Sequence, residues 1–214
     1  MAVSAFAEVM IVGHGTNNDD FCYAMPGTKV RKMHTSRRDA FKTINTEPFA
    51  KVFPNKIELI SGHNKSNGGK TKIDSKFEEK VALIKIHPGE KPDVLDYYVK
   101  NKFKGIILET TGLGHVPSNG KNSWLSKLKE IQRKGIIVCA TAQTIYGRLD
   151  PYVYSNGRKL LETGVIFLED MLSETAFVKL GWVLGHSEWA KNKEIVREKM
   201  LENFSRELNP RLED

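Results

Sequence analysis

Two short segments of the 214-residue chain carry side chains that could take part in a reaction. The first segment is Val30–Phe41 (VRKMHTSRRDAF), which places Lys32 among arginines and close to Asp39. An amine can take a proton from a hydroxyl nucleophile when burial or neighbouring cations lower its pKa from about 10.4. Lys32 is therefore a candidate general base, although composition alone would make it one more solvated lysine.

The second segment is the glycine-rich turn TTGLGH, which follows the apolar run GIILE. Proteins of the α/β class bind ligands at the carboxyl ends of their strands. Thr110, Thr111 and His115 are therefore candidates for substrate contact, although such a turn also serves plain loop geometry. The stretch Tyr154–Arg158 (YSNGR) has the same two interpretations: a capped turn, or part of a substrate loop or partner surface.

Other reactive side chains suggest structural roles. The histidines at 34, 63, 87 and 186 lack the spacing of metal ligands, so no metal site is expected. Cys22 and Cys139 lie far apart and are expected to be small buried hydrophobic residues rather than a disulfide. The apolar region around Trp182 and Trp189 favours helix packing over a nucleotide site.

The composition is that of a globular protein, with 40% apolar and 28% charged residues. No run approaches the roughly 18 apolar residues of a membrane span, and the amino terminus lacks the basic region of a signal peptide. We therefore expect a cytoplasmic protein without a membrane partner. The net charge of +7 permits a polyanionic partner such as tRNA but does not require one, because the lysines are spread along the chain.

The elements that would position these residues alternate between strands and helices, which is typical of an α/β protein with parallel pairing. The expected strands are Glu8–Gly13 (of the buried type), Phe21–Ala24, Ile57–Ser61, Val81–Ile86, Gly105–Glu109, Gly135–Thr141 and Val165–Leu168. The expected helices are a short one from Thr35 or Ser36 to Phe41, then Pro92–Phe103, Lys121–Lys134, Arg158–Thr163, Ser173–Leu184 and Ser187–Leu208.

The polar, glycine-containing stretch around Gly62–Asp74 suggests a domain boundary. We expect residues 1–62 to be the end of a larger parallel-sheet domain and to carry Lys32. Residues 63–80 would be a linker, and residues 81–214 a smaller parallel α/β domain. The strand Glu8–Gly13 opens the chain without a preceding strand–helix pair, so we expect neighbouring strands of it to be missing.

The segment Val30–Phe41 resembles the lysine-bearing segment of the L-asparaginase superfamily, and its HTSRRDAF form is similar to the D-type subunits of archaeal glutamyl-tRNA(Gln) amidotransferases. The resemblance continues through GIILETTGLGHV, AQTIYG, YSNGR and GVIFLEDMLSETAFVKLGWVLG. It implies an asparaginase-like α/β fold, of which this chain is the carboxy-terminal part. It also implies a catalytic set of a threonine in T-G-G-T-I, a Thr-Asp pair in D-G-T-D, and a lysine.

Only the lysine of that catalytic set is found, at Lys32, because neither threonine motif occurs in the 214 residues. His14-Gly15-Thr16-Asn17 looks like the second motif, but Asn17 stands where the aspartate should be. We therefore assign Thr16 to an ordinary turn. His115 is a further departure, because related enzymes carry asparagine near this position, and this puts its substrate contact in doubt.

The resemblance implies a part of a glutaminase whose threonine nucleophiles come from a separate amino-terminal half, so that the chain alone is inactive. In that family ammonia passes to a tRNA-binding kinase partner, the E-type subunit, which converts Glu-tRNA(Gln) to Gln-tRNA(Gln). ATP and magnesium would belong to that partner, with no cofactor in this chain, where no P-loop occurs. A homodimeric assembly is also expected.

Two alternatives remain open. A split or truncated L-asparaginase would need no tRNA partner, and turnover of asparagine against glutamine would identify it. A non-catalytic scaffold or RNA-contacting remnant would instead show salt-sensitive tRNA binding by the isolated chain.

Overall fold

The computed structural model describes residues 6–70 and 72–210, and the chain divides into two compact units. The first unit comprises residues 1–73 and 203–214, and the second comprises residues 74–202. The second unit thus ends earlier than the expected domain 81–214. The difference arises because the tail bonds within the first unit: the Thr28 hydroxyl donates to the Ser205 carbonyl over 2.6 Å, and Arg206 pairs with Glu8.

The second unit is built on a four-stranded sheet in which every strand pairs in parallel with its neighbour. The strand order is β10-β9-β8-β7, so each new strand is added beside the one before it along the chain. This sheet confirms the expected α/β class. Its strands are β7 (Val81–Lys85), β8 (Gly105–Thr110), β9 (Ile137–Ala142) and β10 (Ile166–Phe167).

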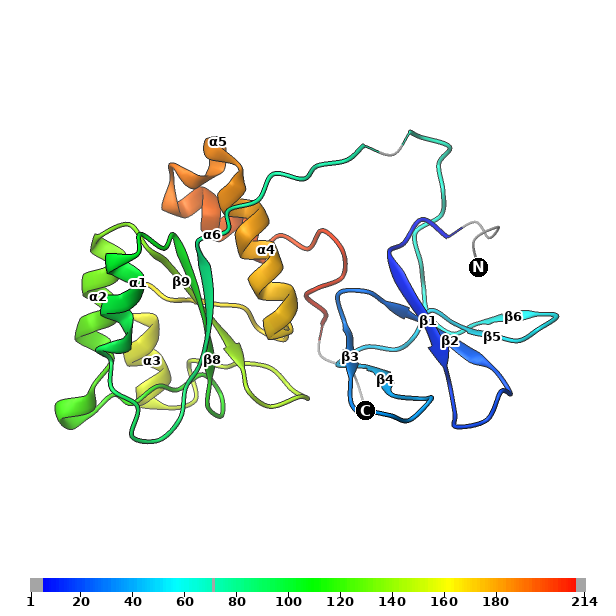
Figure 1. Ribbon diagram of the computed structural model, residues 1–214, viewed down its shortest axis with the longest axis horizontal. Coiled ribbons are helices and arrows are strands. Elements are labelled where there is room, and N and C mark those ends of the chain that lie inside the picture. Colours follow the sequence, from blue (N-terminus) through cyan, green and yellow to red (C-terminus); the bar gives the residue numbers. More distant parts are fainter. Residues whose placement is uncertain (1–5, 71, 211–214) are drawn as a thin grey trace. The chain divides into compact units, whose positions relative to one another are not determined.

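Helices cover both faces of this sheet (Figure 1). Crossovers between parallel strands are right-handed, so a sheet that grows in one direction collects its connecting helices on one face. These are α1 (Val94–Lys100), α2 (Leu125–Arg133) and α3 (Ser155–Leu161), and helix α4 (Ser173–Gly185) covers the other face. Apolar side chains from the strands and from α1–α3 form one core, including Ile84, Leu95, Ile106, Leu108, Trp124, Leu128, Ile131, Val138 and Leu160.

The expected long helix Ser187–Leu208 is wrong, because the chain breaks into α5 (Ser187–Ala190) and α6 (Lys193–Leu201). The break is at Asn192, whose side-chain oxygen accepts a hydrogen bond from the Glu194 backbone N–H over 2.9 Å. Asparagine favours this capping position over a helix interior. Helix α2 is likewise shorter than expected and follows a separate 3₁₀ turn, η1 (Gly120–Asn122).

The described strands of the first unit all pair antiparallel. One sheet has the order β1-β2-β5-β6, and β3 pairs with β4 in a separate hairpin. These strands are β1 (Met10–His14), β2 (Cys22–Pro26), β3 (Val30–Lys32), β4 (Phe41–Thr43), β5 (Ala50–Val52) and β6 (Ile57–Leu59).

Two expectations for this unit are wrong. No helix follows Thr35 or Ser36: residues 33–40 form the turn of the β3–β4 hairpin, and Phe41 begins a strand. Strand β1 is also not buried, because Ile11 and Val12 remain 36% and 44% exposed. In neither unit does a described helix combine the length and apolar character needed to cross a membrane.

Both cysteines are free thiols, as expected, but only Cys139 on β9 is buried, whereas Cys22 on β2 is half-buried. Burial raises the pKa of the Cys139 thiol to about 12, because an apolar environment disfavours the thiolate.

We therefore expect alkylation of the native protein at pH 8 to stop at one thiol per chain, Cys22, and to reach two only in denaturant, as read by intact mass. Cys22→Ser is the matched control and should take up no label while folded. Rapid labelling of two thiols in the native state would contradict the packing of β9.

Candidate functional site

Lys32 is the last residue of β3, opposite Phe41 in the β3–β4 hairpin. Its side chain is exposed, and its Nζ lies 6.0 Å from the centroid of the Phe41 ring. The lysine therefore lies at the end of β3, directly before the turn of residues 33–40. This is the arrangement of an amine presented to something outside the hairpin.

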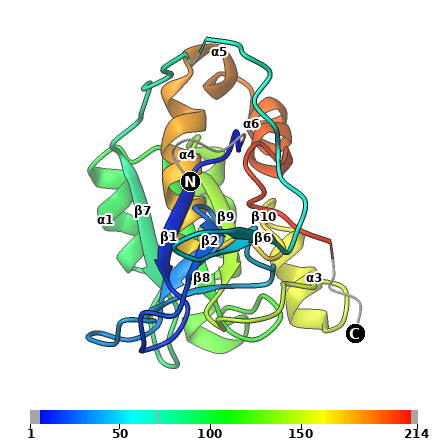
Figure 2. The same ribbon diagram turned by 90° about the vertical axis from the view of Figure 1, so that its right-hand side faces the viewer.

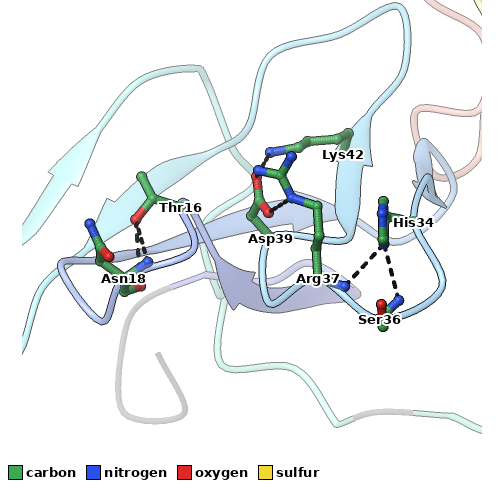
Figure 3. Close-up of polar contacts among 7 residues, drawn as sticks. All are labelled: Thr16, Asn18, His34, Ser36, Arg37, Asp39 and Lys42. Carbon is green, nitrogen blue, oxygen red and sulfur yellow. Dashed lines mark hydrogen bonds and ion pairs between the residues drawn. The ribbon is translucent and has the colours of Figure 1, made fainter.

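The hairpin turn is organised by Asp39, which is only 8% exposed (Figure 3). Its two carboxylate oxygens accept hydrogen bonds from Arg37 Nε and Nη2 over 2.9 and 3.1 Å, and Lys42 Nζ donates over 2.9 Å. The hydrogen bond from Lys42 and the bonds from Arg37 hold the pKa of Asp39 below its ordinary value, against the opposing effect of burial. Asp39 is therefore a structural anion that fixes the turn.

His34 fixes the other side of the same turn. Its Nδ1 accepts hydrogen bonds from the backbone N–H groups of Ser36 and Arg37, each over 3.1 Å (Figure 3). In a helix beginning at Thr35 or Ser36 these N–H groups would lie in the first turn and lack an intrahelical partner. The sequence HTSRRDAF thus encodes a compact hairpin turn.

Two of the cations that lie near Lys32 in the sequence, Arg37 and Arg38, are bound to carboxylates. Arg37 pairs with Asp39, and Arg38 pairs with Asp19 in the β1–β2 turn. The hydrogen bond from Arg38 is the main cause that lowers the pKa of Asp19. These arginines are therefore neutralised by their partners and supply little of the positive field that would turn Lys32 into a base.

Thr16 lies in the β1–β2 turn. Its hydroxyl donates to the Asp20 carboxylate over 3.1 Å. The same hydroxyl accepts from the Asn18 backbone N–H over 3.1 Å (Figure 3). This is the pattern of a threonine that stabilises a turn. The structure agrees with the assignment of Thr16 to ordinary turn chemistry.

The turn of residues 110–115 lies at the carboxyl end of β8 in the second unit. Thr110 is fully buried, and its hydroxyl donates to the Thr141 carbonyl over 2.7 Å, which joins β8 to β9. The Thr111 hydroxyl and backbone N–H both donate to the His115 carbonyl, over 3.2 and 3.0 Å. The two threonines thus shape the turn, and His115 is presented by it.

His115 has an unusual environment for a loop histidine. Its Nε2 is buried without a hydrogen-bond partner in the part of the chain that the structure describes. Its ring meets the ring of Tyr154 edge-on, with centroids 5.5 Å apart. A buried polar atom without a protein partner is rare, and strain, a bound water or ion, or a catalytic role can account for it. The structure thus brings together two segments, at His115 and Tyr154, that the sequence had suggested separately.

Sequence reasoning missed Gln143, which follows β9. Its Nε2 donates to the carbonyls of Ile86 and, over 2.8 Å, Glu109, and its backbone N–H donates to the Thr110 carbonyl over 3.0 Å. It therefore ties the carboxyl ends of three strands beside the turn. A polar residue directly after a buried strand was the available signal. No comparable pattern in the sequence marked Lys29, which is fully buried next to β3.

The predicted residues thus form two groups, Lys32 in the first unit and Thr110, Thr111 and His115 in the second. Among the described residues, no cluster of three or more histidine, cysteine or acidic side chains is placed to hold a metal ion. Neither group contains a threonine hydroxyl activated by a base.

The chain is similar to known proteins along nearly its whole length. The family described as the glutaminase/asparaginase C-terminal domain matches residues 80–199, and the asparaginase N-terminal family matches residues 1–65. The D-type subunit of the glutamyl-tRNA(Gln) amidotransferase of Thermococcus kodakarensis is 50% identical over 212 residues, which cover 98% of this chain and 47% of the relative. The same subunit of Methanothermobacter thermautotrophicus is 40% identical over 211 residues, 98% of this chain and 47% of that protein.

Solved structures agree with this relationship. The thermostable L-asparaginase of Thermococcus kodakarensis superposes with a TM-score of 0.80 at 32% identity, covering 88% of this chain and 55% of that one. L-asparaginase I of Vibrio cholerae gives a TM-score of 0.76 at 27% identity, again with 88% and 55% coverage. The chain spans about half the length of the curated relatives that it matches.

The anchoring role of Asp39 can be tested by pH. Because its folded pKa is depressed, its contribution to stability is present above the unfolded value near 3.9 and is lost as pH falls through the folded pKa. We expect Asp39→Asn to speed hydrogen exchange of residues 33–40 at pH 7, and we expect the difference from wild type to shrink as pH falls below this unfolded value.

Asp93→Asn is the control, because Asp93 stands at the start of α1 without a side-chain capping bond. Equal exchange in wild type and Asp39→Asn at pH 7 would show that the turn does not depend on the carboxylate.

Proposed function

The chain belongs to the glutaminase/asparaginase family, and from that premise we propose that it supplies the lysine-bearing half of a glutaminase that feeds ammonia to tRNA-dependent amidation. The observation that carries the proposal is the similarity to the D-type amidotransferase subunit over 98% of this chain but only 47% of the relative. The chain includes Lys32 and omits the family's threonine motifs.

The first unit supports an additional half, because apolar side chains are exposed at both edges of its sheet. Val9 is 83% exposed beside β1, and Leu59 is 62% exposed on β6. Neighbouring residues of a strand point to opposite faces of the sheet. Because Ile11 and Val12 are both exposed, β1 is uncovered on both faces. Apolar side chains left exposed along a sheet edge favour an interaction site there. The proposed occupant is the amino-terminal half that bears T-G-G-T-I and D-G-T-D.

In the assembled enzyme, a threonine hydroxyl from that half attacks the side-chain carboxamide carbon of glutamine. Lys32 Nζ takes the hydroxyl proton and passes it to the leaving nitrogen, so that the C–N bond breaks and ammonia departs. Water then hydrolyses the glutamyl ester, releasing glutamate and restoring the threonine. His115, with its unpartnered Nε2, is the proposed substrate contact of the second unit.

The ammonia would pass to a tRNA-binding partner, the E-type kinase subunit, which would use ATP and magnesium to activate Glu-tRNA(Gln). A homodimer in the cytoplasm completes the proposed assembly. The second candidate is an L-asparaginase without a tRNA partner, favoured by the 32% identity to a thermostable L-asparaginase. Turnover of glutamine against asparagine, with and without the partner and Glu-tRNA(Gln), separates the two.

Mixing this chain with a separately produced amino-terminal half tests the role of Lys32. We expect each half to be inactive alone, and the mixture to release ammonia from glutamine. Lys32→Ala should lower that activity at least about 100-fold, because a lost general base costs that much or more.

Lys56→Ala is the matched control, since Lys56 is an exposed lysine of the same unit that pairs with Glu58. Co-purification of the halves separates a failure of assembly from a failure of chemistry. Full activity of an assembled Lys32→Ala enzyme, or of this chain alone, would refute the assigned role.

The proposed docking surface can be tested at β1. Val12→Lys should leave the isolated chain folded, because this side chain already meets solvent. It should raise the concentration of the amino-terminal half needed for half-maximal activity about tenfold or more, because a charge would be buried without a partner.

Val178→Lys on α4 is the control, because Val178 is 56% exposed in the other unit. Identical titrations for wild type and Val12→Lys would place the second half elsewhere.

A further inference from the structure

The second unit begins with a strap, defined as residues 74–78, that lies against helix α4 (Figures 1 and 2). The Glu78 backbone N–H donates to the Gly181 carbonyl over 2.9 Å, and Lys76 Nζ lies 3.3 Å from the Glu188 carboxylate. Asp74, at the start of the strap, contacts His186 directly after α4. The strap is therefore bound at both of its ends.

The strap packs against two glycines of α4 that lie one helical turn apart. A Cβ at Gly181 would come within 2.3 Å of Phe77 Cζ, and a Cβ at Gly185 within 2.5 Å of the Phe77 backbone nitrogen. Any larger residue would push the strap away. The G-x-x-x-G spacing in α4 thus serves close contact between a helix and an extended segment.

His186 is only 3% exposed, and both of its ring nitrogens face hydrogen-bond acceptors. Nδ1 lies 2.8 Å from the Trp182 carbonyl oxygen, and Nε2 lies 2.9 Å from Asp74 Oδ2. A carbonyl and an ionised carboxylate can only accept hydrogen bonds. A neutral imidazole has one N–H and would leave the other nitrogen facing an acceptor with no proton between them. Only the imidazolium, with two N–H groups, satisfies both contacts.

The aromatic rings around His186 can stabilise a positive charge on its imidazole. The Trp189 ring stacks on His186 with centroids 4.0 Å apart at 17°, and the Trp182 ring meets it edge-on at 4.9 Å. Indole faces attract cations, most strongly when these are shielded from water. The charged groups around this cluster are Asp74 and Lys76 of the strap, Glu188 of α5, and Lys199 of α6, whose Nζ lies 5.1 Å from the Trp189 centroid.

We propose that His186 carries both ring protons in the native protein and that its ion pair with Asp74 is a proton-dependent latch holding the strap on α4. The latch closes only while Asp74 is ionised and His186 is doubly protonated. It therefore opens towards acid pH, when Asp74 takes up a proton.

Opening the latch would lengthen the connection that reaches the second unit from residue 73. Five released residues span up to roughly 17 Å when extended. The second connection, where the chain returns to the first unit at residue 203, would be unchanged. The latch thus sets the length of one of the two connections, independently of the proposed glutaminase function.

The full chain, labelled with ¹⁵N-histidine, tests the protonation directly. We expect NMR at pH 7 to show protons on both Nδ1 and Nε2 of His186. A single neutral tautomer at pH 7 would overturn the proposal.

Hydrogen exchange tests the latch itself. Asp74→Asn and His186→Gln should each reduce protection of the Glu78 amide about tenfold at pH 7, the effect of losing a charged hydrogen bond. His87→Gln is the control, because the His87 side chain is 65% exposed. Asp74 is half-exposed, so Asp74→Asn keeps the test valid if His186→Gln fails to fold. Unchanged Glu78 protection in Asp74→Asn would refute the latch.

Discussion

Parallel hydrogen bonding between β7, β8 and β9 is the constraint from which the second unit follows. Parallel neighbours require long crossovers, and their right-handedness gathers α1–α3 on one face of the sheet. Helix α4, which follows β10, covers the opposite face of the sheet. Without α4 that face would be exposed apolar surface. The same pairing places the carboxyl ends of the strands at one edge. The turn that presents His115 and the amide of Gln143 meet there for that reason.

The first unit follows a different constraint, because its sheet is short and antiparallel and the unit combines segments from both ends of the chain. The Glu8 carboxylate accepts hydrogen bonds from the Asn64 backbone N–H and from Arg206, whose guanidinium lies 5.2 Å from the centroid of the Phe49 ring. These contacts join β1, the segment after β6 and the carboxy-terminal tail. They compensate in part for a small core, while the edges of the sheet remain apolar and exposed.

The sequence predicted the second unit well, because buried parallel strands such as GIILE and GIIVCAT are continuous apolar runs bounded by turn residues. It failed where a few polar contacts decide the conformation. His34 and Asp39 turn HTSRRDAF into a hairpin, and Asn192 splits one amphipathic pattern into two helices. Lys32 was found through a family resemblance. Gln143 and the ion pair of His186 with Asp74 depend on contacts distant in sequence, which periodicity does not encode.

The position of Lys32 explains why a divided active site would be inactive before assembly. A lysine accepts a proton readily only when its surroundings disfavour the ammonium form. Lys32 is exposed, and Arg37 and Arg38 are neutralised by Asp39 and Asp19. In the first unit the Lys32 side chain is therefore open to solvent, and a docked half would have to cover it. On the proposed function, one docking event supplies the threonine nucleophile and covers the lysine that activates it, so that chemistry cannot precede assembly.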